Sequence, residues 1–334
     1  MTIGITIIGL GRIGASIGLA LASHKDRLTV TGHDKNPAVA QAAKKLGAVE
    51  KTASNLPASV EKADVVILAL PQDQIHDTLK AIAQDLREDV LLVDTAPVKA
   101  ATIAWVKELL PPKRHYVGLL PALNPLVLEE TGQGVNSARA DLFQGGLIAV
   151  SAPEGAAEGA IKLTTDLVSL LGSSPFFADP AEVDGMMACV HLLPQLAAVA
   201  LTETTLTQPS WNDIRKLAGA RFSAGTALLA AEEPGALTEA VNQNQINTIR
   251  LLDEMIANLS VLREEIATGE RKKLERKLKD LSNDRKLWQT ERGKGDWQAI
   301  ESGRPDLPAD GDILSRQFGG LKKLFKRGDK SNEE

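Results

Sequence analysis

Short apolar runs alternate with helical patterns along the first half of the chain. Runs rich in Val, Ile and Leu cover residues 3–8, 28–31, 65–70 and 90–93, and helical patterns occupy 15–23 and 38–46. Strands that are apolar almost throughout are typical of a parallel sheet with helices on both faces. The pattern therefore predicts an α/β domain with a doubly wound, mainly parallel sheet.

The pattern changes at about residue 179. Strand-like runs stop there, and Ala- and Leu-rich helical segments occupy residues 182–207, 211–232 and 234–265, followed by a charged helical pattern at 270–288. Beyond Gly293 the chain is rich in Gly, Pro and charged residues, which is typical of a flexible tail. The sequence therefore predicts three parts: a sheet domain with a connecting segment (1–178), an all-α domain (179–290) and a charged, flexible tail (291–334).

A glycine motif follows the first predicted strand and opens the first helix: Gly9-Leu10-Gly11-Arg12-Ile13-Gly14. In such a turn the first glycine permits a tight bend, the second lets a pyrophosphate approach the backbone, and the third lets helix and strand pack closely. The anion then lies at the helix N-terminus, whose free N–H groups and dipole favour negative charge. The motif predicts a Rossmann dinucleotide-binding site.

An acidic residue at the end of the second predicted strand bears on the choice of cofactor. Asp34 stands 20 residues after Gly14, where a carboxylate accepts hydrogen bonds from the ribose of NAD and repels the 2′-phosphate of NADP. Lys35 follows it directly, and a cation there would accept that phosphate. We therefore expect NAD as the cofactor, with NADP as the open alternative.

Further candidate residues follow from the rule that ligands of such a sheet bind outside the carboxyl ends of its strands. Leu70, Pro71 and Thr95 come after two predicted strands, and we expect them to contact the cofactor. Lys99 is either a substrate anchor or an exposed lysine at the start of a helix. Asn124 either donates a hydrogen bond to a substrate oxygen or shapes the turn before the next proline.

His191 lies in an apolar helical stretch of the second half. A histidine in that setting is either a packed, hydrogen-bonded residue or a catalytic group that faces the cofactor. Cys189 is the one cysteine, so neither an intrachain disulfide nor a cysteine-based metal site is expected. His, Asp and Glu also lack metal-ligand spacing along the sequence, and we expect no metal.

Composition and charge restrict the class of protein. The chain has 334 residues, of which 43% are hydrophobic and 24% charged, as in ordinary globular proteins. A net charge of -5 gives no electrostatic reason to bind nucleic acid or an anionic membrane. The start of the chain lacks a signal-peptide pattern, and the apolar run at 192–201 is too short for a membrane span and contains Pro194. We therefore expect a cytoplasmic protein that binds a small-molecule substrate.

Several segments, in this order, resemble the prephenate/arogenate dehydrogenase family of tyrosine biosynthesis, from Gly9 to about Trp288. Residues 9–18 are similar to the family's GxGxxGxSxG, 94–99 resemble D-V-G-S-x-K, and 183–195 resemble H-D-x(3)-A-x(2)-S-H-L-P-H. The resemblance implies NAD(P)-dependent oxidative decarboxylation of prephenate or arogenate.

The Ala- and Leu-rich helices are apolar on more faces than one chain can bury, which favours a homodimer.

Several positions that carry the family's chemistry hold other residues in this chain. The family's catalytic histidine falls at Leu120 and its substrate-contacting serine at Pro97, while Arg221 alone stands near the place of a carboxylate-binding arginine. The three histidines of the helical motif fall at Val183, Leu192 and Gln195. The chain does have a histidine, His191, at the motif's serine position beside them. The sequence therefore predicts a dehydrogenase with a weakened or altered substrate site. The alternative is a dinucleotide-binding sensor without hydride transfer.

Overall fold

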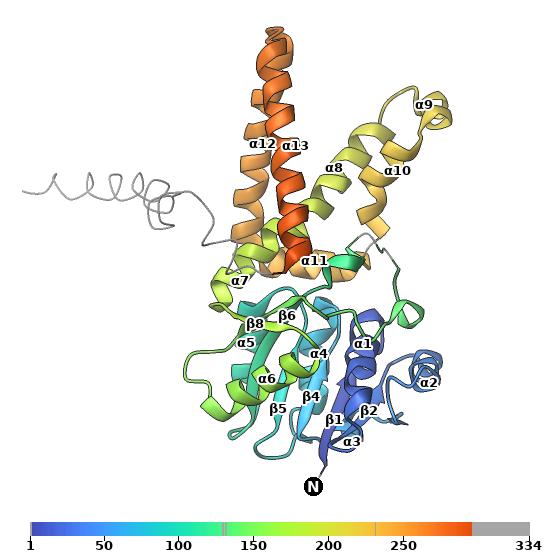
Figure 1. Cartoon of the computed structure of the whole chain (residues 1–334), viewed down its shortest axis with the longest axis vertical. Coiled ribbons are helices and arrows are strands. Elements are labelled where there is room, and N and C mark those ends of the chain that lie inside the picture. The colour runs from blue at the N-terminus through green and yellow to red at the C-terminus, as the bar shows by residue number, and fades with distance from the viewer. Residues whose placement is uncertain (1, 129, 131, 231, 296–334) are drawn as a thin grey trace, which may run out of the picture. The chain divides into compact units, whose positions relative to one another are not determined.

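The computed structural model describes residues 2–128, 130, 132–230 and 232–295. By their internal contacts the described residues divide into two units, one up to residue 277 and one over residues 278–295. Figure 1 labels the helices and strands of the chain. The sheet and the candidate site belong to the first unit. Most of the predicted tail, residues 296–334, lies outside the described residues, but residues 291–294 are helical and end α13 (Arg271–Lys294).

A sheet of eight strands, in the order β3-β2-β1-β4-β5-β6-β7-β8, forms the centre of the first unit. The strands from β3 to β6 are parallel, β7 is antiparallel to β6, and β8 is parallel to β7. The predicted fold class, a doubly wound and mainly parallel sheet, is confirmed. The strands are β1 (Ile3–Ile8), β2 (Leu28–His33), β3 (Lys51–Thr52), β4 (Val65–Leu68), β5 (Leu91–Asp94), β6 (His115–Ala122), β7 (Leu147–Ser151) and β8 (Ser174–Phe177).

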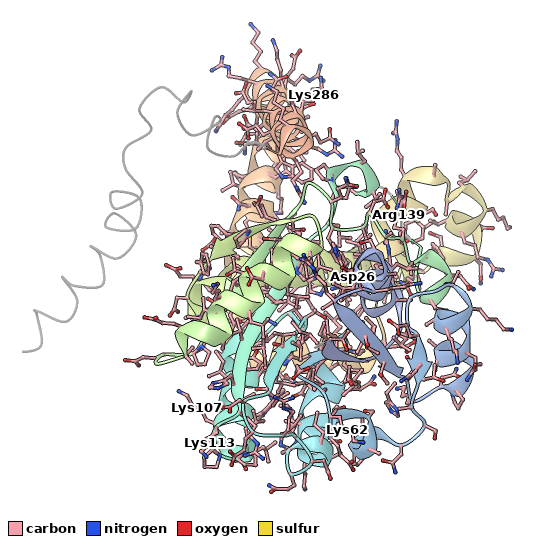
Figure 2. All side chains as sticks on the ribbon, turned by 60° about the horizontal axis from the view of Figure 1, so that its bottom comes forward. Asp26, Lys62, Lys107, Lys113, Arg139 and Lys286 are labelled. Carbon is pink, nitrogen blue, oxygen red and sulfur yellow. The ribbon has the colours of Figure 1, made fainter. Side chains whose placement is uncertain are left out.

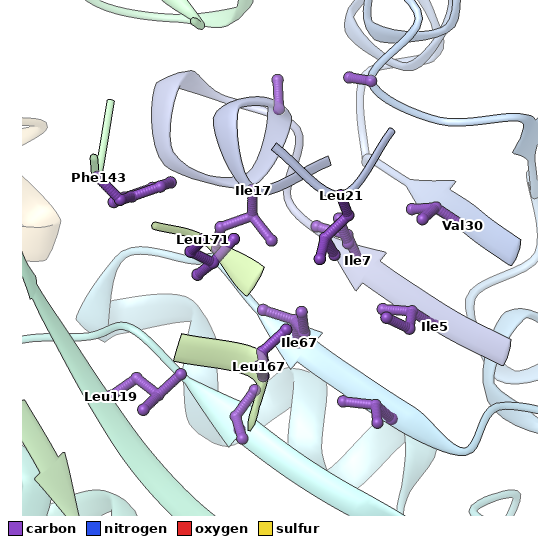
Figure 3. Close-up of a cluster of buried hydrophobic side chains, with 14 of the residues drawn as sticks. Ile5, Ile7, Ile17, Leu21, Val30, Ile67, Leu119, Phe143, Leu167 and Leu171 are labelled. Atoms are coloured by element: carbon purple, nitrogen blue, oxygen red, sulfur yellow. The ribbon is translucent and has the colours of Figure 1, made fainter. Parts of the chain in front are cut away.

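Both faces of the sheet are buried at its centre, which explains why a central strand such as β4 is apolar throughout. Successive side chains of a strand point to opposite faces, and along β4 Val65 and Ile67 pack with one set of helices while Val66 and Leu68 pack with another. Figure 3 shows Ile67 in the first of these clusters. That cluster includes α1 (Arg12–Leu21), α2 (Pro37–Lys45) and α6 (Glu158–Leu170), and the second includes α3 (Leu56–Val60), α4 (Gln72–Ile82) and α5 (Lys99–Leu109).

The described chain beyond residue 179 is helical, as predicted. The helices are α7 (Pro180–Met187), α8 (Leu193–Leu206), α9 (Trp211–Leu217), α10 (Ala220–Thr226), α11 (Pro234–Gln243), α12 (Gln245–Ala267) and α13. A π-helical turn, η4 (Ala188–Leu192), joins α7 to α8, and a 3₁₀ turn, η5 (Ala227–Ala230), follows α10.

Helices α7 and α8 form one continuous run through η4. Asp179 begins it with a capping box, in which its carboxylate accepts from the Ala181 N–H and Glu182 accepts from the Asp179 N–H. Pro194 lacks an N–H, but it lies at the start of α8, where the wider π turn lets the helix continue. The run therefore has the length and composition of a membrane span, contrary to the sequence-based expectation. Only 22% of its most apolar stretch is buried within one chain.

Candidate functional site

The glycine motif forms the turn between β1 and α1, and its three glycines differ in what constrains them. Gly9 has a φ of +89°, and a Cβ on Gly14 would stand 1.9 Å from the Gly9 carbonyl oxygen. Both glycines are therefore required by the fold itself. A Cβ on Gly11 would meet nothing within 4 Å. The bare backbone at Gly11 faces open space, which is what a pyrophosphate-binding turn requires.

Asp34 lies at the end of β2 beside the glycine turn. One carboxylate oxygen accepts from the Leu10 N–H at 2.8 Å, and the other accepts from the Asn36 N–H at 2.8 Å. Because it lies at the end of β2 beside the turn, the carboxylate stands where the ribose of a bound dinucleotide is expected. Asp34 is half-buried, and Lys35 is exposed.

The other residues of the turn contribute backbone or link it to a loop. Leu10 is fully buried and its N–H donates to Asp34, while Ile13 is half-buried against the same core cluster. Arg12 points to the loop after β6, where its guanidinium donates to the carbonyls of Glu130 (2.9 Å) and Gly132 (3.1 Å).

The loop after β6 is also fastened to α1 by Arg139. The Arg139 N–H donates to the Ser16 hydroxyl at 3.0 Å, and its guanidinium forms ion pairs with Glu130 and Asp141. Figure 2 labels Arg139 among the side chains of the first unit. Since Gln133 of the same loop donates to the carbonyl of Ala230 at 2.7 Å, the loop links the dinucleotide turn to the helical part.

The carboxyl ends of β4 and β5 lie next to the point where the strand order reverses, between β1 and β4. Leu70, Pro71 and Thr95 follow these two strands and are all half-buried. The Thr95 N–H donates to the Leu68 carbonyl at 3.0 Å, which fixes the start of the second loop. These three residues, the predicted cofactor contacts, therefore lie at the edge at which ligands of this type of sheet bind.

Lys99 is fully buried, so the alternative of an exposed lysine is wrong. Its ammonium donates to the Asp94 carboxylate at 2.8 Å, and the Tyr116 hydroxyl donates to the other oxygen of that carboxylate. Burial lowers the pKa of Lys99, and the negative charge of Asp94 opposes this shift. For Tyr116, burial and the charge of Asp94 both raise the pKa. The ammonium is paired inside the fold, so the structure gives no support to its predicted role as a substrate anchor.

Asp184 of α7 attaches the helical part to this buried cluster. Its carboxylate accepts from the N–H groups of Lys99 (2.6 Å) and Ala100 (3.0 Å), at the N-terminus of α5. These groups have no partner within their own helix, so the carboxylate caps α5. Burial raises the pKa of Asp184, partly offset by the two N–H groups.

Asn124 shapes the turn before Pro125, which is one of its two predicted roles. Its side-chain oxygen accepts from the Leu126 N–H at 3.0 Å, and its side-chain nitrogen donates to the Asp141 carbonyl at 2.9 Å. The residue is buried and both ends of its amide are used. It shapes the turn, and the predicted hydrogen bond to a substrate is not supported.

His191 lies on η4 and faces a carboxylate that the sequence analysis did not single out. Its Nε2 is 3.4 Å from Glu232 Oε2, and Gln195 Nε2 is 3.3 Å from the same oxygen. Gln195 Nε2 also donates to the His191 carbonyl at 3.1 Å. The side chain of His191 is 37% exposed and that of Glu232 19%, so the pair is open to solvent on one side.

Packing places this pair over the carboxyl edge of the sheet. Ala188 and Leu192, which flank His191 on η4, pack with Val98 of the loop after β5. Gly235, just after Glu232, lies against Asp73 at the start of α4, since a Cβ there would be 3.0 Å from its carboxylate. Two separate contacts therefore hold His191 and Glu232 near the ends of β5 and β4.

Leu120 and Pro97, two of the positions that depart from the family's chemistry, are buried. Leu120 lies on β6 opposite Ala149, and Pro97 lies in the loop after β5. Arg221 is exposed on α10, which packs against α8 and η5. Among residues 2–295, apart from the gaps, no group of three or more His, Cys, Asp or Glu side chains forms a metal site.

Two sequence models of one family match the chain in succession. The model described as prephenate dehydrogenase, nucleotide-binding domain, matches residues 17–176. The model described as prephenate dehydrogenase, dimerization domain, matches residues 179–280. Together they span most of the sheet and helical parts.

Characterised relatives match over most of the chain. It is 27% identical over 266 residues to a cyclohexadienyl dehydrogenase of Zymomonas mobilis, covering 79% of this chain and 88% of that protein. It is 25% identical over 266 residues to a prephenate dehydrogenase of Bacillus subtilis, covering 78% of this chain and 69% of the relative.

Solved structures share the fold. Prephenate dehydrogenase from A. aeolicus, in complex with hydroxyphenyl propionate and NAD+, superposes with a TM-score of 0.75 at 23% identity, covering 86% of this chain and 98% of that one. Synechocystis arogenate dehydrogenase gives a TM-score of 0.67 at 21% identity, covering 86% and 100%. At these identities the likeness shows a common architecture.

Proposed function

Because the chain belongs to the prephenate dehydrogenase family, we propose that it oxidises a hydroxyl-bearing acid of the prephenate or arogenate type with NAD. The predicted family and the prediction of an NAD(P)-dependent dehydrogenase are thereby confirmed, and nothing in the comparisons supports the alternative of a sensor. The substrate site differs from the family's pattern at Leu120, Pro97 and Gln195, so we propose an altered substrate preference or a reduced rate.

The observation that carries this proposal is the open backbone at Gly11 between two glycines that the fold requires. We propose that the cofactor binds along the turn 9–14, with Asp34 at its ribose and Leu70, Pro71 and Thr95 beside its nicotinamide end. When bound, NAD supplies the hydride acceptor. The carboxylate of Asp34 favours NAD over NADP, because it meets the position of the 2′-phosphate.

We further propose that residues 1–178 bind the cofactor and 179–290 bind substrate and form a homodimer of a soluble, cytoplasmic enzyme. The match to a dimerization domain supports the dimer. So does the apolar run Pro180–Leu206, which is mostly exposed in one chain. Light scattering should give about twice the chain mass of 35.6 kDa, and a concentration-independent monomer would overturn the assembly.

The test of function has two stages. Calorimetry with NAD and NADP should show binding of both or of NAD alone, with NAD the tighter ligand. Steady-state assays with prephenate and arogenate, following the absorbance of reduced cofactor, should then show turnover. Binding without any turnover would favour the sensor, and absence of binding at millimolar dinucleotide would overturn the whole proposal.

A further inference from the structure

Glu232 is a carboxylate in a position that needs a partner. It is largely buried beside the ends of β4 and β5, and an unpaired carboxylate there would be unfavourable. Burial acts to raise its pKa, but the contact with His191 and the Gln195 amide outweigh burial and hold the pKa below its ordinary value. The carboxylate is therefore ionised at neutral pH, with His191 as its charged or hydrogen-donating neighbour.

The partners of His191 assign its tautomer. Nε2 lies 3.4 Å from the carboxylate oxygen of Glu232 and 3.4 Å from Gln195 Nε2. Since the two protons of that amide nitrogen are directed to the His191 carbonyl and to Glu232, and the carboxylate only accepts hydrogen bonds, the proton of a neutral imidazole belongs on Nε2. Nδ1 is then the unprotonated nitrogen, free to accept a proton. An imidazole held in one tautomer by a carboxylate is the arrangement of an acid–base catalyst.

Gln195 fixes the pair and leaves one acceptor unused. Its Nε2 lies among acceptors of His191 and Glu232, so the orientation of the amide is set and Oε1 points the other way. That oxygen is buried and has no hydrogen-bond partner among the described residues. A buried acceptor without a partner is unfavourable, and a hydroxyl donor on a ligand would satisfy it.

We propose that Glu232 is a positioning residue for His191, and that His191 Nδ1 takes the hydroxyl proton of the substrate. This inference rests on the proposed dehydrogenase function. As the hydroxyl-bearing carbon loses a hydride to NAD+, its O–H bond breaks, that electron pair forms the carbonyl, and the proton passes to Nδ1. The substrate is oxidised by two electrons and NAD+ is reduced to NADH.

The first experiment compares two neighbouring carboxylates in the full chain. Glu232→Gln should lower kcat at least about tenfold, and by up to about 10⁴-fold as in other carboxylate–histidine pairs, with NAD affinity unchanged. Glu233→Gln, on the same linker but exposed, should leave kcat within twofold of wild type. Equal rates for wild type and Glu232→Gln would overturn the positioning role.

The second experiment tests the proton transfer itself. His191→Ala should lower kcat by about 10² to 10⁴-fold, and added imidazole should restore part of the rate. His76→Ala, a half-buried histidine of α4 that contacts Trp105 and lies outside the pair, should show neither loss nor rescue. A loss that imidazole does not restore, with a lowered thermal midpoint, would show a structural role for His191 and overturn the proposal.

A readout without substrate separates this inference from the proposed function. In ¹⁵N-labelled protein the imidazole of His191, identified by its absence in His191→Ala, should be in the Nε2–H form, and Glu232→Gln should change that pattern. A predominant Nδ1–H form in the wild type would overturn the pairing whether or not the protein turns over. Turnover in the wild type with an unchanged rate in Glu232→Gln would refute the pairing and leave the dehydrogenase standing.

Discussion

Two polar clusters lie at the same edge of the sheet and differ in their access to solvent. In the first, Lys99 and Asp94 are fully buried and join β5, β6 and α5. In the second, His191 is more than a third exposed and Glu232 about a fifth. A pair that is sealed from solvent is part of the architecture, whereas an open pair can exchange a proton with a ligand.

Closeness to the strand ends does not by itself make a polar residue catalytic. Lys99 lies in a segment that resembles a family motif, whereas Glu232 lies in the linker between η5 and α11, which matches no motif noted above. The structure nevertheless gives the sealed position to Lys99 and the open one to Glu232. We therefore expect loss of stability from changes in the first cluster and loss of activity from changes in the second.

The largest expected effect is on stability. Lys99→Met removes the cation and leaves the Asp94 carboxylate buried without it, so the free energy of unfolding should fall by about 3–5 kcal/mol. Urea unfolding measures this loss. Lys107→Met, on the exposed side of the same helix and labelled in Figure 2, is the control and should change stability by less than about 0.5 kcal/mol. A similar small change for Lys99→Met would show that the sealed cluster contributes little.

The burial of Lys99 could not be predicted from the sequence. The motif places a lysine after a strand end, but its burial depends on Gly118 of the neighbouring strand. A Cβ on Gly118 would stand 2.6 Å from Lys99 Cδ, so only glycine leaves room for the lysine stem. Such complementarity between distant positions does not show in local periodicity.

Other parts of the molecule were predictable to different degrees. The strands β1, β2, β4 and β5 were predicted because parallel strands buried on both faces are rich in apolar residues. The short edge strands β3 and β8 were not, since the first has two residues and the second contains a proline. Glu232 could not be identified from the sequence, because tertiary packing brings it to His191 from a different helical segment.

The next effect concerns the family's own substrate. Leu120, Pro97 and Gln195 replace groups that the family uses to take a proton and hold the substrate, and the base that we propose, His191, stands at a different position of the chain. Oxidation of prephenate itself should therefore be about 10² to 10⁴-fold slower than in relatives that keep those groups. Steady-state assays check this. A turnover near the usual enzyme median of about 10 s⁻¹ would contradict it.

Restoring one residue sharpens that result. If the rest of the site is still shaped for prephenate, Leu120→His should raise its turnover substantially, while Leu120→Gln, which adds a polar group without a base, should not. No gain in Leu120→His would indicate a different substrate, and the second cluster would then be adapted to that molecule.

A smaller effect is expected at the cofactor turn, and it separates ligand binding from folding. Gly11→Val places a side chain in open space, so the fold should persist while the dissociation constant for NAD rises at least about 100-fold, or about 2.8 kcal/mol. Calorimetry and circular dichroism measure the two properties. Gly159→Val is a control, because a Cβ there also meets nothing within 4 Å. Unchanged NAD affinity in Gly11→Val would remove the turn from the binding site.

The smallest effect is the dependence of stability on pH, for which the two clusters should differ in sign. The pKa of Glu232 is lowered in the folded chain, so between the folded and unfolded pKa values the folded chain binds fewer protons. Its carboxylate therefore stabilises the fold above pH 4.5, and this contribution is lost as the pH falls through the folded pKa. Since the pair is partly exposed, Glu232→Gln should lower stability by no more than about 1 kcal/mol.

Asp184 of the buried cluster should show the opposite trend. Burial raises its pKa above the ordinary 3.8, so the folded chain binds more protons in that window and stability falls as the pH rises through it. Urea unfolding from about pH 3.5 to about pH 7 should show the difference between wild type and Glu232→Gln growing with pH, and that between wild type and Asp184→Asn shrinking. Parallel trends would mean that solvent access does not distinguish the two clusters.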